Sequence, residues 1–148
     1  MTVQVGLIGL GAMGLGMAQS LRRAGHTVHV YDVRAEAAQA FAKDGGVVAA
    51  SPAALGAACN VLVSVVVNAA QTESVLFGPE GCAAAMKPGS VFVMCSTVEP
   101  NWSVAMEKRL NDMGLLYIDA PISGGAAKAA SGQITMMSAG APAAYAVA

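Results

Sequence analysis

Short aliphatic runs alternate with segments of helical periodicity along the whole chain, starting at the third residue. Such alternation is typical of βαβ units, which build parallel sheets. It predicts strands at residues 3–8, 27–31, 47–48, 61–67, 91–95, 115–118 and 134–138. It predicts helices at residues 12–24, 35–43 and 100–113, a further helix that opens at Ser51 and Pro52, and the start of another after Pro142. The expected fold class is α/β, with a doubly wound and mostly parallel sheet.

Two of these segments carry strong patterns. Residues 61–67 are almost uninterrupted aliphatic side chains, which is typical of a central parallel strand that is buried on both faces. The helix at 100–113 is expected to pack through one apolar face, formed by Trp102, Met106, Leu110 and Met113. The helical pattern that starts near Pro142 carries no stop signal, which suggests that the natural chain continues beyond Ala148.

The composition is unusually apolar, and this raises the question of a membrane protein. Of the 148 residues, 55% are hydrophobic and 11% are charged. The most apolar stretch, residues 3–21, contains Gln4, Gln19 and five glycines, whereas a membrane-spanning helix needs about 20 apolar residues without such breaks. No basic residue precedes Arg22, so the pattern of a signal peptide is missing. We expect one cytoplasmic domain with a large buried surface and no membrane partner.

Charge and metal-binding residues narrow the function further. The net charge is −1 and no basic stripe is present, so no nucleic-acid partner is expected. The three cysteines are widely spaced, which predicts buried, reduced thiols and not a zinc site: Cys59, Cys82 and Cys95. His26 and His29 are interpreted as ordinary loop and strand residues, and no metal site is expected.

A glycine-rich turn follows the first predicted strand and has the spacing G-x-G-x-x-G. It consists of Gly9, Leu10, Gly11, Ala12, Met13 and Gly14. A strand precedes it, a helix follows it, and an acid ends the next strand, which is the context of a Rossmann-type dinucleotide site. In such a site Gly9 permits the tight turn, Gly11 lets the backbone approach a pyrophosphate, and Gly14 lets the helix pack closely. The helix N-terminus offers N–H groups to phosphates. A tight turn with no ligand is the alternative, and the complete context favours binding.

The end of the second predicted strand bears on the choice between NAD and NADP. The carboxylate of Asp32 can accept hydrogen bonds from both ribose hydroxyls and would repel a 2′-phosphate. Two unit charges 4 Å apart oppose each other by roughly 4 kcal/mol at an effective dielectric constant of 20. Val33 and Arg34 follow, and an arginine here could accept a phosphate, stack on adenine or face solvent. NAD is the expected cofactor, with NADP the alternative.

The carboxyl ends of the later strands lie at the same edge of such a sheet. Val67 and Asn68 end the fourth predicted strand, and Thr97 follows the fifth. Asn68 and Thr97 could donate or accept hydrogen bonds at the ribose or the carboxamide. Both residue types are also common helix caps, so that alternative stays open.

Two motifs resemble the β-hydroxyacid dehydrogenases, the family of 3-hydroxyisobutyrate dehydrogenase and 6-phosphogluconate dehydrogenase. Residues 6–14, GLIGLGAMG, resemble the opening motif of the family, and residues 119–125, DAPISGG, resemble its substrate-binding signature. Within the family, residues 66–78 and 124–132 look most like the L-threonate dehydrogenase branch. The resemblance implies that Thr97 contacts the nicotinamide side, and that the substrate carboxylate is held by Ser123, Gly124 and Gly125. Otherwise these glycines form a structural turn.

The resemblance also implies a reaction, namely hydride transfer from a small hydroxy acid to NAD. The catalytic lysine and the all-helical second domain of the family lie beyond Ala148, so this chain is expected to be the NAD-binding domain, without a catalytic residue and inactive alone. Lys128 follows the substrate motif but does not match the motif of the catalytic lysine. The full-length protein is expected to be a homo-oligomer. The alternatives are a non-catalytic, redox-sensing NAD-binding module and an imine reductase of the same superfamily.

Overall fold

The computed structural model describes residues 3–148, and it confirms the predicted α/β class. The strands are β1 (Gln4–Ile8), β2 (Thr27–Tyr31), β3 (Val47–Val48), β4 (Val61–Ser64), β5 (Val91–Met94), β6 (Leu116–Asp119), β7 (Ile122–Ser123), β8 (Thr135–Met136) and β9 (Ala139–Gly140). The helices are α1 (Ala12–Arg23), α2 (Ala35–Lys43), α3 (Pro52–Ala58), α4 (Ala69–Phe77), the 3₁₀ turn η1 (Ala83–Ala85), α5 (Pro100–Asp112), α6 (Gly125–Ser131) and α7 (Pro142–Val147).

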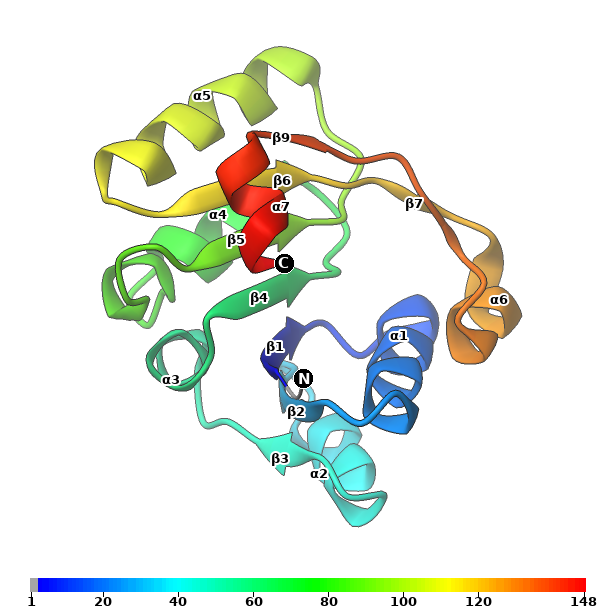
Figure 1. Ribbon diagram of the computed structural model, residues 1–148. Coiled ribbons are helices and arrows are strands. Elements are labelled where there is room, and N and C mark those ends of the chain that lie inside the picture. The colour runs from blue at the N-terminus through cyan, green and yellow to red at the C-terminus, as the bar shows by residue number, and fades with distance from the viewer. Residues whose placement is uncertain (1–2) are drawn as a thin grey trace.

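Within the described residues, seven strands form one sheet in the order β3-β2-β1-β4-β5-β6-β9, with helices on both faces (Figure 1). All neighbouring strands are parallel except β6 and β9, which are antiparallel. The strand order reverses direction between β1 and β4, because the chain winds outward from β1 to one edge and then from β4 to the other. Such a reversal leaves a crevice at the carboxyl ends of the two central strands, where ligands bind in doubly wound folds.

Each face of the sheet has its own hydrophobic core. In β4, Val61 and Val63 point to the face covered by α1, α2 and α7, whereas Leu62 points to the face covered by α3, α4 and α5. All four residues of β4 are buried, as expected for a central parallel strand with helices on both sides. The two cores hold the carboxyl ends of the strands at one edge of the sheet.

The first half of the chain follows the predicted elements closely. The bounds of β2, α2 and β3 are those predicted, and β1 and α1 differ from the prediction by one residue. The Oγ of Ser51 accepts a hydrogen bond from the Ala54 amide at 3.1 Å, which confirms the predicted cap of α3. A helix does begin at Pro142, as predicted.

The fourth strand is shorter than predicted. We expected it to reach Val67, but it ends at Ser64, opposite Ile8 at the end of its partner β1. The Val65 amide still donates to the Ile8 carbonyl at 2.8 Å, but β1 then turns away at Gly9 and the pairing with β1 stops, and the side chain of Val67 is exposed. The next residues form α4, which the aliphatic pattern did not reveal.

Two further predictions need correction. Residues 134–138 do contain a strand, β8, as predicted, but β8 pairs with β7 in a separate two-stranded ribbon, and β9 is the strand that takes the sheet edge beside β6. Met113 does not join the apolar face of α5, since the helix ends at Asp112 and Met113 is 42% exposed. Ser103 is buried on that helix instead, and its Oγ lies 2.8 Å from the Tyr117 hydroxyl.

The cysteines and histidines occupy the expected environments. All three cysteines are free and buried, and burial raises their pKa values to about 11 for Cys59 and about 12 for Cys82 and Cys95. In β2 the Nε2 of His29 lies 2.6 Å from Oε1 of Gln4, and burial lowers the pKa of His29. Across residues 3–148, no three His, Cys, Asp or Glu side chains gather as metal ligands would. Nor does any helix in that range combine the length and apolarity that crossing a membrane demands.

Candidate dinucleotide site

The turn between β1 and α1 depends on its glycines. Gly9 has φ of 98°, in the left-handed region, and a Cβ there would collide with the Val65 carbonyl. A Cβ on Gly14 would collide with the Gly9 carbonyl, so this glycine permits the close approach of α1 to the turn. A Cβ on Gly11 would meet nothing within 4 Å, so its backbone faces open space. The two packing roles that the spacing predicts are therefore observed, and Gly11 is accessible to a ligand.

The N-terminus of α1 is open to an anion. Its N-cap is Gly11, and within the described residues no side chain caps this helix and no acid lies in its first turn. The first intrahelical bond runs from the Leu15 amide to the Gly11 carbonyl at 2.8 Å, so the amides between them point out of the helix end. Arg22 and Arg23 lie in the last turn, at the negative end of the dipole.

Asp32 lies directly across the turn and is tied to it. One carboxylate oxygen accepts a hydrogen bond from the Leu10 amide at 2.6 Å, and the other accepts bonds from the Arg34 amide at 2.8 Å and the Arg34 Nε at 3.2 Å. The Arg34 guanidinium also donates to the Leu10 carbonyl at 3.1 Å. Burial raises the pKa of Asp32, but the hydrogen bonds from Arg34 and Leu10 and the Arg34 charge outweigh it and hold that pKa below its usual range. The site therefore contains an ionised carboxylate.

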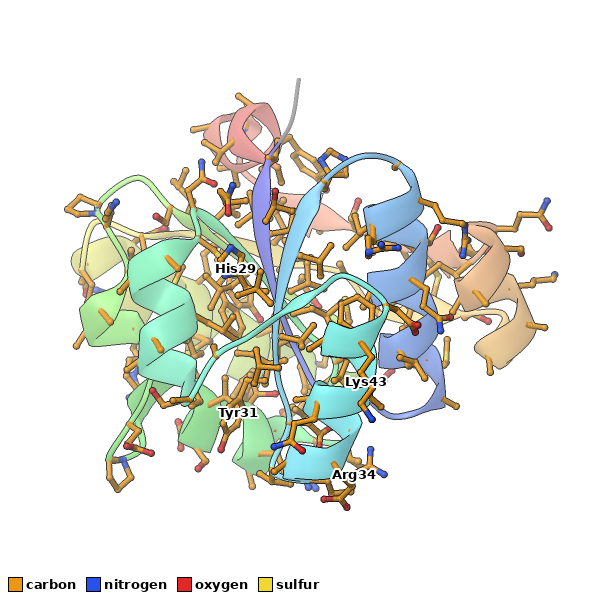
Figure 2. All side chains as sticks on the ribbon, turned by 90° about the horizontal axis from the view of Figure 1, so that it is seen from below. His29, Tyr31, Arg34 and Lys43 are labelled. Carbon is orange, nitrogen blue, oxygen red and sulfur yellow. The ribbon has the colours of Figure 1, made fainter. Side chains whose placement is uncertain are left out.

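A cavity of about 360 Å³ opens between these groups and the end of β4. The turn contributes Gly9 and Gly11, and the end of β2 contributes Tyr31 and residues 32–34. Figure 2 shows Tyr31 and Arg34 at the same end of β2, with His29 further back along the strand. The opposite wall is mostly apolar and comes from the β4–α4 segment: Val65, Val66, Val67, Gln71, Ser74 and Val75. An apolar wall facing a carboxylate suits an adenosine, which has a flat base and a polar ribose.

Most of this second wall was not predicted, because α4 was missed. The sequence does carry a signal for the helix, since Asn68 and Gln71 are spaced as in a capping box. The Asn68 Oδ1 accepts a bond from the Gln71 amide at 2.9 Å, and the Gln71 Oε1 accepts one from the Val67 amide at 2.8 Å. Asn68 is therefore a helix cap whose oxygen already accepts one bond, and its amide nitrogen and the second lone pair of that oxygen remain for a ligand.

The other predicted residues lie outside the cavity wall. Thr97 is exposed just after β5, next to the buried Ser96, whose hydroxyl donates to the Val66 carbonyl at 2.6 Å. Ser123, Gly124 and Gly125 are exposed at the junction of β7 and α6, and both glycines have positive φ, 133° and 81°. The structure thus brings together the glycine turn, residues 32–34 and Val67, whereas Asn68, Thr97 and residues 123–125 are not part of the cavity wall.

A second cavity, of about 450 Å³, lies beside β6 and β9. The wall of this cavity includes Glu107 and Asp119, and no lysine or arginine lines it. Two carboxylates would repel a diphosphate, so this cavity does not suit a dinucleotide. The crevice at the glycine turn is the better site.

A doubly wound sheet with an open glycine turn and a carboxylate at the end of β2 defines a Rossmann-type dinucleotide-binding protein. Comparison with known proteins specifies the family: the chain belongs to the family described as the NAD binding domain of 6-phosphogluconate dehydrogenase, whose model matches residues 4–148.

Named relatives are dehydrogenases. The chain is 55% identical to L-threonate dehydrogenase of Cupriavidus necator over 148 residues, which are 100% of this chain and 50% of that protein. It superimposes on the crystal structure of 3-hydroxyisobutyrate dehydrogenase from Salmonella typhimurium with a TM-score of 0.93 and 39% identity, covering 98% of this chain and 50% of that one. It is also similar to Psf3 in complex with NADP+ and 2-OPP, with a TM-score of 0.91, 30% identity, and coverage of 97% and 51%. The chain spans about half the length of the curated relatives it matches.

Proposed function

We propose that this chain is the cofactor-binding part of a cytoplasmic dehydrogenase that oxidises a small hydroxy acid, such as L-threonate or 3-hydroxyisobutyrate, with NAD. The single observation that carries the proposal is the uncapped N-terminus of α1 opposite the ionised Asp32. The names of the relatives support the reaction class and the substrates.

The residues of the crevice would divide the cofactor among them. The amides of the first turn of α1 would hold the diphosphate, since they have no side-chain acceptor. The apolar wall at Val66, Val67 and Val75 would cover the adenine. A carboxylate offers about four acceptor positions and Asp32 uses three, so one remains for a ribose hydroxyl.

The nicotinamide end of the cofactor and the bound substrate would lie towards Thr97 and residues 123–125. The nicotinamide supplies the hydride acceptor when it is bound. Thr97 would orient the nicotinamide, and the Ser123 hydroxyl with the amides of Gly124 and Gly125 would bind the substrate carboxylate. Charge-assisted bonds of this kind are the strong ones, so they would fix the substrate carbon opposite the ring.

Preference for NAD over NADP is a finer part of the proposal. The ionised Asp32 disfavours a 2′-phosphate, but the Arg34 Nε lies 3.2 Å from its carboxylate and offsets part of that charge. The similar Psf3 structure contains NADP+. We therefore propose that the Kd for NAD is modestly lower than the Kd for NADP, and that Arg34 determines the size of this difference.

We also propose which parts of the full-length protein supply the catalytic base and the oligomer contacts. Since the relatives are about twice as long, we assign the base that removes the hydroxyl proton, and the contacts that make a homo-oligomer, to the half that this chain does not span. The chain alone should bind NAD without turnover.

Calorimetric titration of the chain with NAD tests the proposal. Saturable binding is expected, and it should weaken in Asp32→Ala but not in Asp44→Ala, an acid at the end of α2 outside the crevice. Folded protein that takes up neither NAD nor NADP would overturn the proposal.

A further inference from the structure

We propose that Gly16 is a positioning residue, because it lets the backbone of α6 rest directly on α1 and thereby sets the place of residues 123–125 relative to the dinucleotide site. The inference rests on the proposed function, since it takes residues 123–125 to be the substrate clamp. It concerns a residue outside the G-x-G-x-x-G spacing.

Gly16 is buried at the contact between the two helices. A Cβ on Gly16 would lie 2.6 Å from the Ala130 amide nitrogen, 2.9 Å from the Ala129 Cβ and 3.0 Å from the Ala129 carbonyl carbon. Two of these three atoms belong to the backbone of α6, which cannot rotate away as a side chain could. Any larger residue at this position must therefore push α6 off α1.

Two further contacts extend the interface along the same stripe of α1. The Arg23 guanidinium donates to the Ala130 carbonyl, and a Cβ on Gly132 would lie 2.8 Å from the Ser20 Oγ. Gly16, Ser20 and Arg23 are spaced by four and three residues, so they lie on one face of the helix. Figure 1 shows α6 beside α1, at the far side of the molecule from α5.

This interface connects the two proposed sites over a short path. Gly16 lies four residues from Ala12, the first residue of α1, which is about 6 Å along the helix axis. On the other side, α6 begins at Gly125, so the proposed carboxylate clamp continues directly into the helix that Gly16 supports. At the other end of the clamp, Ser123 in β7 pairs with Thr135 in β8, and this pairing fixes the position of Ser123. A shift of α6 therefore moves the clamp while the glycine turn stays in place.

The expected effect is selective for the substrate. Displacing Ser123, Gly124 and Gly125 would weaken their charge-assisted hydrogen bonds to the substrate carboxylate, while the contacts to NAD at the glycine turn stay in place. We expect Gly16→Ala in the full-length enzyme to lower kcat/KM for the hydroxy acid at least tenfold, chiefly through a higher KM, and to change the Kd for NAD less than threefold. The probe is whichever of L-threonate and 3-hydroxyisobutyrate the unmodified enzyme oxidises.

Gly56→Ala is the matched control. Gly56 is also a buried helical glycine, and its Cβ would lie 2.7 Å from the Cys82 carbonyl oxygen, but it lies in α3 on the other face of the sheet. It should lower stability without a selective rise in the KM for the hydroxy acid. Equal effects of the two substitutions on KM, or an unchanged KM in Gly16→Ala, would overturn the inference.

If the Gly16→Ala variant does not fold, a second pair of substitutions that add no bulk tests the same interface. Arg23→Gln removes the bond to the Ala130 carbonyl without adding bulk, whereas Arg22→Gln changes its exposed neighbour. The KM for the hydroxy acid should rise twofold to tenfold in Arg23→Gln only, and equal KM values in both would refute the role of the interface. An unmodified enzyme that binds no NAD or oxidises neither acid would instead refute the proposed function.

Discussion

Asp32→Asn tests the electrostatics of the crevice without changing the shape of the side chain. The substitution removes the negative charge but keeps one oxygen, which can still accept the bond from the Leu10 amide. It also frees the Arg34 guanidinium, which in the native chain lies 3.2 Å from the carboxylate. The site thus changes from a paired carboxylate to an unpaired cation, and this change favours a 2′-phosphate.

The size of the expected change in the Kd values for NAD and NADP follows from how exposed the Asp32–Arg34 pair is. At an effective dielectric constant of 20, a unit charge 4 Å from a phosphate contributes roughly 4 kcal/mol. The Asp32 side chain is only 8% exposed, but it is paired with Arg34 and borders an open crevice, so its repulsion of a 2′-phosphate is about 1 kcal/mol, and removing it lowers the Kd for NADP by a factor of about five. Loss of a charge-assisted bond to the ribose costs NAD about 1.5 kcal/mol, a factor of about ten. The ratio of the two Kd values should shift about 50-fold towards NADP.

Calorimetric titration of both coenzymes measures this ratio directly. Arg34→Gln should move it the other way, because the carboxylate then stands alone before the phosphate. Asp44→Asn should leave it unchanged, since Asp44 lies at the far end of α2. A ratio that stays within twofold of the native value in Asp32→Asn would refute the account of cofactor choice.

Three further outcomes are expected. Gly14→Ala should abolish NAD binding, measured by calorimetry, because the new Cβ collides with the Gly9 carbonyl. The buried Ser64 hydroxyl finds no partner among residues 3–148, so Ser64→Ala should leave stability in urea unchanged or raise it, whereas Ser103→Ala should cost about 1 kcal/mol. The lowered pKa of Asp32 contributes stability above its unfolded pKa of 3.8, and this is lost as pH falls through the folded pKa. Urea unfolding between pH 5 and pH 2 should therefore show a steeper loss in the native chain than in Asp32→Asn.

The sequence predicts the β1–α1–β2 unit well because its signals are local. The glycine spacing, the apolar strand before it and the acid at the end of β2 all lie within residues 4–32, and each depends on backbone geometry that neighbouring residues determine. The same applies to the cap at Ser51. These elements can therefore be predicted without knowing which distant segments contact one another.

The rest of the site depends on contacts between distant segments. The end of β4 is set by the turn of β1 at Gly9, which the aliphatic run of residues 61–67 cannot reveal. Helix α6 is a short alanine-rich segment with no apolar periodicity, and it is held by α1 more than a hundred residues earlier in the chain. The sequence holds a local signal for α4 in the capping pattern of Asn68 and Gln71, which strengthens the helix-cap alternative that Asn68 alone suggests.

The amide resonances of the isotopically labelled chain, followed by NMR during titration with NAD, test the central claim most directly. Binding of the diphosphate at the start of α1 predicts saturable shifts that are largest at Gly11, Ala12 and Met13, with smaller ones at Val33 and Val67. If NAD bound with its largest shifts beside Ser103 and Val104 in the second cavity, or left the first turn of α1 unchanged, the account would be contradicted.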